Sequence, residues 1–194
     1  MISNAGCNTI AHVEMIKRPS LQEIMHISSI WTVELRRKDN NALLQRSISK
    51  NIYTIEGAKS ILDVAVHGAT QISTWYVVPF NSNTTPINTM IYATPVFTEF
   101  TGYSEATRQI YSEAAAANSS NTIYMTNSAN KAAFTITGSD TIYGAAIVGG
   151  GSAPGTKSDT AGGGTLLCVT KFAAGIAVDA TTVLSTTVQI NLTI

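Results

Sequence analysis

Charged residues are scarce in this chain. Asp, Glu, Lys and Arg make up 12% of its 194 residues, against about 25% in an ordinary soluble domain. The 12 basic and 12 acidic side chains balance to a formal net charge of zero. A nucleic-acid-binding domain usually concentrates Lys and Arg on one face. The charge balance therefore argues against a protein that binds along the phosphate backbone of a nucleic acid.

Cysteines and long apolar runs are also few. Cys7 and Cys168 are the two cysteines, and they do not form the pattern of a disulfide framework, so free thiols are expected. The first 25 residues hold four charged side chains and no continuous apolar core of a signal peptide. No stretch reaches the ~18 apolar residues that cross a bilayer. We therefore expect a cytoplasmic site of synthesis and no membrane partner.

Threonine takes the place of the missing charge. The chain has 26 threonines, and threonine suits a half-exposed pleated sheet. Of the 24 charged residues, 13 lie in the first 59 positions and seven lie from Glu113 onward. A chain of this length holds one domain with a real core and is short for two large ones. The composition indicates an all-β domain with a neutral, hydroxyl-rich exterior.

The first 25 residues form a separate segment in this interpretation. They lack periodicity until Ser20-Leu-Gln-Glu23, which resembles a capping box that opens a short helical turn. We predict an extended N-terminal arm over residues 1–25 and a domain over residues 26–194. The arm's apolar side chains would remain in water in a monomer unless they dock, so the arm is interpreted either as packing on a neighbouring subunit or as a disordered or locally folded tail. These side chains are Ile16, Leu21, Ile24 and Met25.

Strict alternation begins at Ile30. Trp31, Val33 and Leu35 fall on one face of a predicted strand, and polar residues fall on the other. Turn residues at 38–41 precede a second predicted strand at 43–48, and a third apolar run covers 52–55. A meander is the simplest connection for these three segments.

Residues 57–80 combine a short amphipathic helix, a glycine stop and an aromatic-rich strand. Apolar residues recur at helical spacing, and Gly68 stands where a helix ends. The stripe consists of Ala58, Ile61, Leu62, Ala65 and Val66. We expect this helix to lie against the sheet and close one end of the core. A strand over 71–80 follows, and Pro79 places its end at a sheet edge or a bulge.

The rest of the chain favours further strands. Residues 81–95 indicate a long surface loop, and strands are predicted at 109–112, 131–137, 141–148 and 165–172, with Phe134 and Ile136 facing inward. Gly138-Ser139-Asp140 is interpreted as a hairpin turn. The last eight residues alternate to Ile194, which indicates a terminal strand. Eight or so short strands predict a β-sandwich or jelly roll with one short helix.

The glycine-rich segment 149–164 resembles a phosphate-binding loop only in its composition. Gly150 and Gly155 have the spacing of a Walker loop, but Thr156 intervenes before Lys157. A strand-forming run follows at Thr165, whereas a phosphate cradle needs the N-terminus of a helix. We interpret the segment as a flexible connection between two strands.

No catalytic, metal or cofactor site is predicted. Asp63 and His67 have a spacing that can hold a metal ion, but no third ligand accompanies them, and a solvated helix face explains both. Glu99, Glu105 and Glu113 each stand alone in polar, threonine-rich surroundings. The sequence also has no Gly-x-Ser-x-Gly elbow.

Two segments carry a resemblance to known proteins. LDVAVHGATQISTWYVVPF at 62–80 and FTEFTGYSEATRQ at 97–109, with the strands that follow, resemble proteins encoded near the major capsid protein of tailed bacteriophages. Those proteins are similar to capsid cement, or head-decoration, proteins. The resemblance covers roughly residues 30–194.

The resemblance implies a non-enzymatic structural protein on the outer capsid surface of a virion. It would bind the phage major capsid protein and clamp neighbouring subunits, as a homotrimer or a homodimer, without contacting nucleic acid directly and without a cofactor. The residues expected in the domain, either as surface contacts or as core anchors, which is the commoner place for the aromatic ones, are Tyr76, Phe97, Phe100, Tyr103 and Arg108. Those expected in the arm are Ile16, Leu21, Ile24 and Met25.

Two other function classes remain as alternatives. The first is a tail- or fibre-associated β-sandwich that binds a host glycan through Asn/Thr-rich loops and exposed aromatic side chains. The second is a glycan hydrolase or lyase, which needs two carboxyl groups facing each other across a cleft. Neither alternative is carried by a motif in the sequence.

Overall fold

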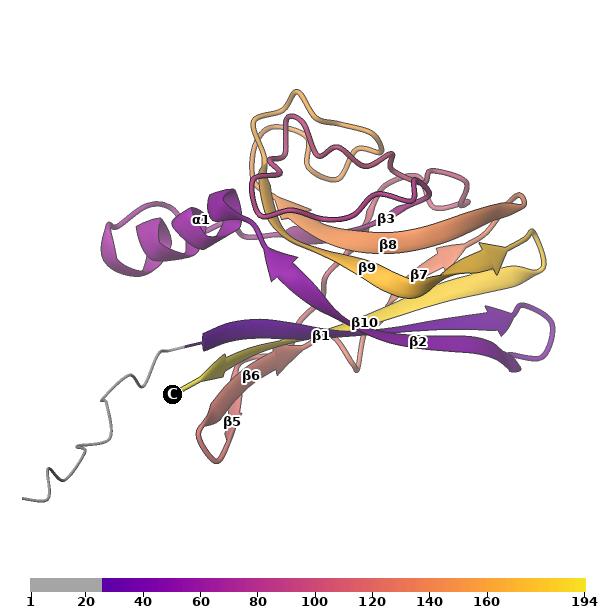
Figure 1. Cartoon of the computed structure of the whole chain (residues 1–194), viewed down its shortest axis with the longest axis horizontal. Coiled ribbons are helices and arrows are strands. Elements are labelled where there is room, and N and C mark those ends of the chain that lie inside the picture. Colours follow the sequence, from indigo (N-terminus) through magenta and orange to yellow (C-terminus); the bar gives the residue numbers. More distant parts are fainter. Residues whose placement is uncertain (1–25) are drawn as a thin grey trace, which may run out of the picture.

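A computed structural model describes residues 26–194, and the predicted arm and its apolar residues lie outside the described part. Within it the chain forms antiparallel strands and one helix (Figure 1). The strands are β1 His26–Arg37, β2 Leu43–Tyr53, β3 Trp75–Phe80, β4 Gln109–Ile110, β5 Ala117–Ser119, β6 Thr122–Thr126, β7 Ala132–Thr135, β8 Asp140–Gly149, β9 Thr165–Val178 and β10 Thr182–Thr193. The helix is α1 Ile55–Val66. The predicted all-β class with one short helix is confirmed.

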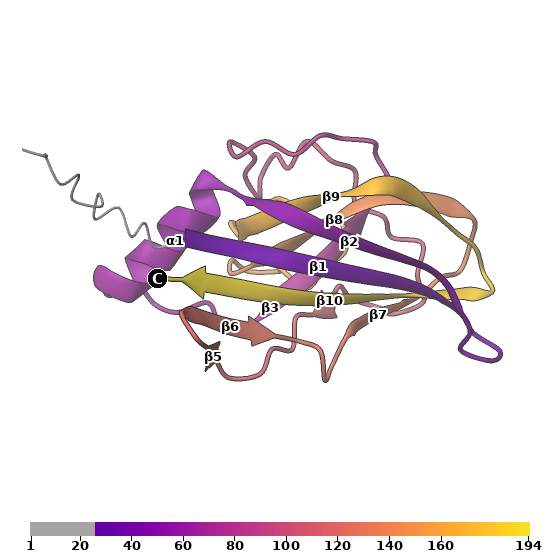
Figure 2. The same cartoon turned by 60° about the horizontal axis from the view of Figure 1, so that its bottom comes forward.

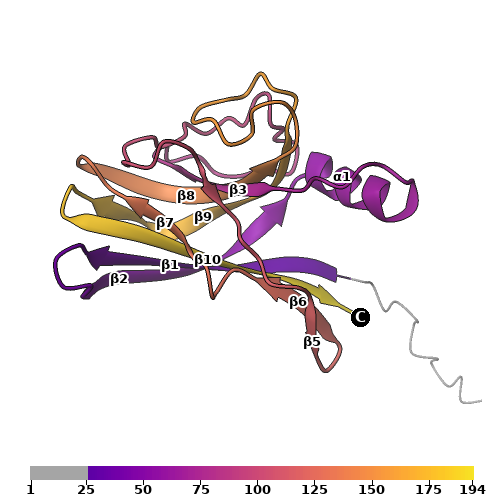
Figure 3. The ribbon, with the colours of Figure 1, turned by 180° about the vertical axis from the view of Figure 1, so that it is seen from behind.

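One curled sheet makes both layers of a sandwich. Its strand order is β4-β3-β8-β9-β2-β1-β10-β6-β5, and β7 pairs with β10 beside this path. β2 belongs to both layers, because residues 43–50 pair with β1 and residues 51–53 pair with β9. Figure 3 shows β8 and β9 in one layer and β1, β2 and β10 in the other.

The alternation of β1 is confirmed. Trp31, Val33 and Leu35 are buried, and β1 pairs with β10 along its whole length, from His26 opposite Thr193 to Arg37 opposite Thr182. The predicted C-terminal strand is therefore present as β10. These two long strands form the centre of one layer.

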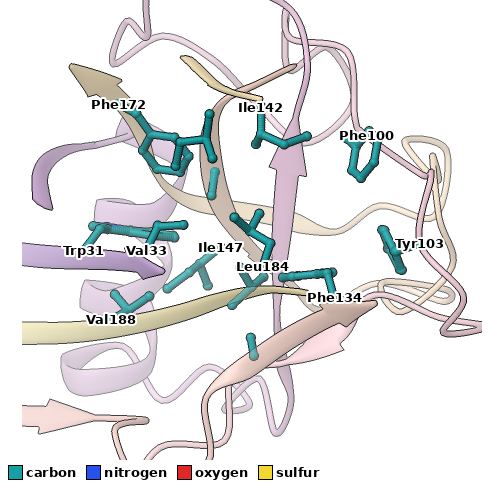
Figure 4. Close-up of a cluster of buried hydrophobic side chains, with 14 of the residues drawn as sticks. Trp31, Val33, Phe100, Tyr103, Phe134, Ile142, Ile147, Phe172, Leu184 and Val188 are labelled. Carbon is teal, nitrogen blue, oxygen red and sulfur yellow. The ribbon is translucent and has the colours of Figure 1, made fainter. Parts of the chain in front are cut away.

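The main core lies between the two layers (Figure 4). Phe134 and Ile136 are fully buried, as predicted. The Tyr103 ring meets the Phe134 ring edge-on, with centroids 5.0 Å apart. Trp31, Ile147 and Leu184 pack in the same cluster. Burial of this many large apolar side chains, at roughly 1.5–3 kcal/mol each, supplies the main stabilisation of the fold.

β2 corrects the prediction of two separate strands at 43–48 and 52–55. It is a single strand that bends from one layer into the other. Asn51 accepts a hydrogen bond from the Ser29 backbone N–H at 2.9 Å. The Thr170 hydroxyl lies 2.8 Å from both the Ser49 hydroxyl and the Lys50 carbonyl oxygen. In the sequence these polar residues look like a break between two strands. In the structure they form hydrogen bonds at the bend of one continuous strand.

α1 forms as predicted but packs differently. The Thr54 side chain caps its first turn by accepting from the Gly57 N–H at 2.9 Å, and the helix ends before Gly68, whose φ is +76°. Gly57 is its one buried residue. The predicted stripe of Ala58, Ile61, Leu62, Ala65 and Val66 is exposed, so the prediction that it packs on the sheet is wrong.

Close contact at one end explains this orientation of α1. Gly57 lies so near the Leu167 backbone of β9 that a Cβ at this position would overlap it. The helix is therefore fixed to the sheet by its first turn. Figure 2 shows it at the end of the molecule where β1 begins and the chain ends.

The segment Gly138-Ser139-Asp140 is not a hairpin turn. β7, before it, pairs with β10, whereas β8, after it, pairs with β3 and β9. The turn carries the chain from one layer to the other. β3 also begins at Trp75 instead of 71. Pro79 lies beyond the two residues of β3 that pair with β4, but it is not at an open edge, because its carbonyl accepts from the Phe100 backbone N–H at 2.8 Å and Phe80 bridges Glu99.

The hairpin of β5 and β6 was not predicted. β5 is three residues long and fully exposed, so it has no buried face to produce a periodic pattern. Within residues 26–194, no helix has the length and apolar character needed to cross a bilayer.

Candidate functional site

Two long loops, residues 81–108 and 150–164, form a layer above β8 in Figure 1; we refer to them as the loop layer. A second apolar cluster supports them from below. In this cluster the rings of Phe80 and Phe97 stack with centroids 4.8 Å apart. Met90 and Tyr92 from the first loop pack there against Val148 of β8.

Arg108 connects the two loops. Its Nε and Nη2 groups donate to the Glu99 carboxylate, with Nη2 to Oε2 at 2.6 Å. Nη1 donates to the Tyr92 hydroxyl at 3.2 Å and to the Pro154 carbonyl at 2.9 Å. Nη2 also donates to the Asp159 carbonyl at 2.9 Å. All five N–H donors of the guanidinium are thereby used inside the protein.

The Glu99–Arg108 ion pair is buried. The side chains of Arg108 and Glu99 are 3% and 6% exposed. Burial lowers the pKa of Arg108, but the hydrogen bonds and the charge interactions with Glu99 and Tyr92 together outweigh it, and the net shift is upward. Glu99 also accepts from the Ser158 backbone N–H at 2.9 Å. The pair therefore fixes the glycine-rich loop to the loop before β4.

Tyr92 and Asp159 make a second link between the loops. The Tyr92 hydroxyl donates to Asp159 Oδ2 at 2.6 Å, and this bond lowers the pKa of Asp159. Burial raises the pKa of Tyr92 to about 12, and the bond to Asp159 adds to the effect. Tyr92 thus stays a neutral donor to an ionised carboxylate at neutral pH.

Glu56 and Lys157 complete the attachment. Glu56, in the first turn of α1, accepts from the backbone N–H groups of Tyr92 at 2.9 Å and Leu166 at 2.7 Å. Lys157 Nζ lies 3.8 Å from the centre of the Tyr103 ring and donates to the Tyr103 carbonyl at 2.8 Å. The segment 149–164 joins β8 to β9 as predicted, but these contacts hold it in place, whereas its glycine content alone indicated flexibility.

A cavity of about 280 Å³ lies between the loops beside this network. Its apolar wall includes Val78, Phe97 and Leu166, and its polar wall includes Arg108 and Asp159. Because the hydrogen bonds of Arg108 are all made within the protein, an anion would have to displace one of them to bind. The arrangement is that of a structural clamp.

Apolar side chains project from the loop layer. Ile87, Ile91 and Val96 are 52%, 40% and 67% exposed. Val96 has a φ of 66°, a left-handed conformation that costs a β-branched residue about 1–3 kcal/mol. Its neighbour Phe97 is held in the apolar cluster. Strain at an exposed apolar tip marks this position as a candidate contact.

α1 presents a second exposed apolar surface. Ile55, Ala58, Leu62 and Val66 recur at helical spacing on its outer side, and we refer to them as the outer stripe. Ile55 and Leu62 are 59% exposed and Val66 is 82% exposed. A helix of a monomer normally turns such a stripe toward the core. The outer stripe therefore has the character of a surface for a partner.

The predicted contact residues of the domain lie mainly beneath these surfaces. Phe97, Phe100, Tyr103 and Arg108 are buried, and Tyr76 is half-buried against Gly155. Phe97 and Arg108 meet around the cavity, while Phe100 and Tyr103 belong to the main core. They hold the loop layer from inside, and a direct capsid contact through them stays a prediction.

The prediction that Glu99 and Glu105 stand alone is wrong. Glu99 pairs with Arg108, and the Glu105 carboxylate accepts from the Thr135 backbone N–H at 3.1 Å. The sequence offered one signal for the first pair, which is a glutamate and an arginine nine positions apart inside a resembling segment. Nothing in the sequence indicated Tyr92 or Asp159.

The other candidate residues are placed as follows. Asp63 lies in α1 and His67 is its C-cap residue, and residues 26–194 contain no group of three or more His, Cys, Asp or Glu side chains arranged for a metal ion. Cys168 is a free thiol, and burial raises its pKa to about 12. A thiol in this state is unreactive.

Comparison with known proteins found no significant match among protein-family models, curated proteins or solved structures.

Proposed function

We propose that this protein is a non-enzymatic virion structural protein that binds the outer surface of the major capsid lattice of a tailed phage and clamps neighbouring subunits. The observation that carries the proposal is the outer stripe of α1, with Leu62 59% and Val66 82% exposed. An apolar helix face directed away from its own core is suited to a protein partner.

The two resembling segments build the surfaces described above. Residues 62–80 include the second half of α1 and all of β3, and residues 97–109 include Glu99 and Arg108. The two segments therefore contain Leu62 and Val66 of the outer stripe and both members of the buried ion pair of the loop layer. This coincidence supports a shared role in presenting a binding surface.

A fixed surface suits a cement protein on physical grounds. Loops that are already ordered lose less conformational freedom on binding. A protein that binds the assembled lattice better than free subunits stabilises that lattice by linkage. Many copies, arranged as trimers at threefold or dimers at twofold positions, give a high total affinity from small individual contacts.

Glycan binding by a tail- or fibre-associated module is less well supported. Such modules usually stack a sugar on an exposed Trp or Tyr ring. Trp31 is fully buried, and Trp75 is half-buried against the core. Neither tryptophan is an exposed side chain of the kind that stacks a sugar in such modules, and we favour the capsid as the partner.

Co-sedimentation with expanded, empty heads of the phage tests the proposal. The protein should pellet with heads, and Leu62→Asp/Val66→Asp should reduce its occupancy at least about tenfold, since each buried apolar side chain contributes about 1.5–3 kcal/mol. Asn118→Asp/Asn121→Asp adds the same two charges at exposed positions and should bind normally. A wild-type protein that stays in the supernatant, or equal binding by both variants, would contradict the proposal.

A further inference from the structure

An apolar groove is open at the end of the sandwich where β1 begins. One part is a cavity of about 340 Å³ between α1 and the start of β3. Its apolar lining comprises Ile61, Val64, Ala65, Ile72, Trp75 and Met125. A second cavity, of about 140 Å³, is lined by Ile123, Met125, Ile190 and Leu192 among others. Met125 lines both cavities, so they form one surface, which we call the open-end groove.

The open-end groove continues the main core. Ile190 lies opposite Met125 and Leu192 lies opposite Ile123 in the pairing of β10 with β6. Alternation places all four on the same face as Val188, which is fully buried in the core. Ile61 and Ile123 nevertheless remain 36% exposed. Part of the core-facing side of the sheet therefore remains uncovered by the elements within residues 26–194.

β1, the first described element, begins beside this groove. His26 pairs with Thr193, and Ile27 pairs with Leu192, which is a groove residue. α1 and the start of β1 lie at the same end of the molecule in Figures 1 and 2. Because an extended chain covers at most about 3.3–3.6 Å per residue, Met25, Ile24 and Leu21 are all within reach of the groove.

The segment has the side chains that such a groove needs. The capping box at Ser20–Glu23 predicts a helical turn. In this turn Leu21, Ile24 and Met25 stand at positions i, i+3 and i+4, which share one face. An apolar face of three residues adjoins an uncovered apolar groove in the same chain.

We propose that residues 16–25 fold back into the open-end groove of their own chain, with Leu21 and Ile24 seated between α1 and β6. Only Met25 separates Ile24 from β1, so the segment is held near its own groove at high effective concentration. Docking there removes the exposed ends of Ile61 and Ile123 from water. This proposal does not depend on the proposed function.

Trp75 reports on the groove in the full-length chain. Trp31 is fully buried and supplies a constant background. The variant Leu21→Asp/Ile24→Asp should increase acrylamide quenching of Trp75, and the amides of β6 should exchange at least about tenfold faster, as expected for the loss of one to two buried side chains. Asn8→Asp/Gln22→Asp adds the same charge off the apolar face and should match the wild type.

Three outcomes decide the inference. Unchanged quenching and exchange in Leu21→Asp/Ile24→Asp, and also in the milder Leu21→Ala/Ile24→Ala, would overturn it. Wild-type protection that disappears on dilution, together with a dimer in light scattering, would mean that the segment docks on a second copy and would also overturn it. Protection that persists on dilution in a monomer supports docking in the same chain.

Discussion

Arg108 is the residue on which the loop layer depends. All of its N–H groups donate to four partner residues from two loops, of which Tyr92 and Asp159 are the most distant from each other in the sequence. A buried ion pair adds little stability compared with apolar residues of the same size, but the loss of one partner leaves an uncompensated charge. Arg108 therefore fixes the arrangement of the loops.

Replacing Arg108 should be costly. Arg108→Ala leaves the Glu99 carboxylate buried without its partner, and we expect it to lower the free energy of unfolding by about 3–5 kcal/mol in urea titrations. Arg37→Ala breaks a pair in which both side chains are about half exposed and should cost less than about 1 kcal/mol. Similar losses of unfolding free energy in the two variants would contradict the role of Arg108 in holding the two loops together.

Replacing Val96 by glycine should stabilise the protein. Its φ of 66° strains a β-branched residue, and Val96→Gly removes this strain at the expense of chain entropy. We expect a gain of up to about 1 kcal/mol in thermal unfolding, with weaker binding to heads if the tip contacts them. Ile87→Gly, at a position without this strain, should lose stability. A destabilised Val96→Gly would show that the conformation carries no strain.

The buried tyrosines predict alkaline sensitivity. Burial raises the pKa of Tyr92 to about 12 and raises the pKa values of Tyr53, Tyr103 and Tyr111 in the same direction. Groups whose folded pKa exceeds the unfolded value stabilise fully below the unfolded pKa of about 10. That stability is lost as pH rises through the folded-state pKa.

The urea midpoint should therefore fall above about pH 10, together with the appearance of tyrosinate absorbance, and it should fall less in Tyr92→Phe. A midpoint that stays constant to about pH 11 would oppose this account.

At the scale of elements, one glycine sets the position of α1 against the sheet. Gly57 lets the helix approach the Leu167 backbone of β9. Gly57→Ala should destabilise the protein even though Ala is favoured over Gly in a helix by about 1 kcal/mol. Gly138→Ala, where a Cβ would meet no atom within 4 Å, should be neutral. Denaturant titration distinguishes the two, and a stabilised Gly57→Ala would show that the helix does not need this contact.

Elements with one buried face were predictable from the sequence. β1 and β10 alternate along their length, and alternation follows directly from burial of one side. The end of α1 was also predictable, because Gly68 takes a left-handed conformation.

Features that depend on partners distant in the sequence were not predictable. The stripe of α1 has the same pattern whether it faces a core or a partner, so its exposure was missed. The bend of β2 depends on Thr170, which lies about 120 positions away. The clamp depends on Asp159 and Tyr92, which contribute a carbonyl group and a hydroxyl group to Arg108. Pairing at such separations leaves no local period.

At the scale of the whole molecule, the sandwich supports two surfaces with different roles. The core between the layers fixes β3 and β8, and these strands support the loop layer. α1 follows β2 in the chain and contacts β9 through its first turn, and its outer stripe is exposed. The molecule therefore resembles a stable scaffold that presents apolar contacts on a neutral exterior.

A neutral exterior predicts binding that is insensitive to salt. The chain has no net charge, and apolar contacts are not screened. Occupancy on heads should change less than about twofold between about 0.05 and 0.5 M NaCl, where an interface of opposite charges weakens strongly. A steep loss of binding with salt in the same sedimentation assay would show that charged contacts dominate.

Cryo-electron microscopy of purified virions tests the central proposal most directly. A cement protein is predicted to give density of this size at many symmetry-related positions on the outer capsid surface, and deletion of its gene should remove that density and weaken the shell. Density confined to the tail, or no density in the virion, would contradict the proposed role.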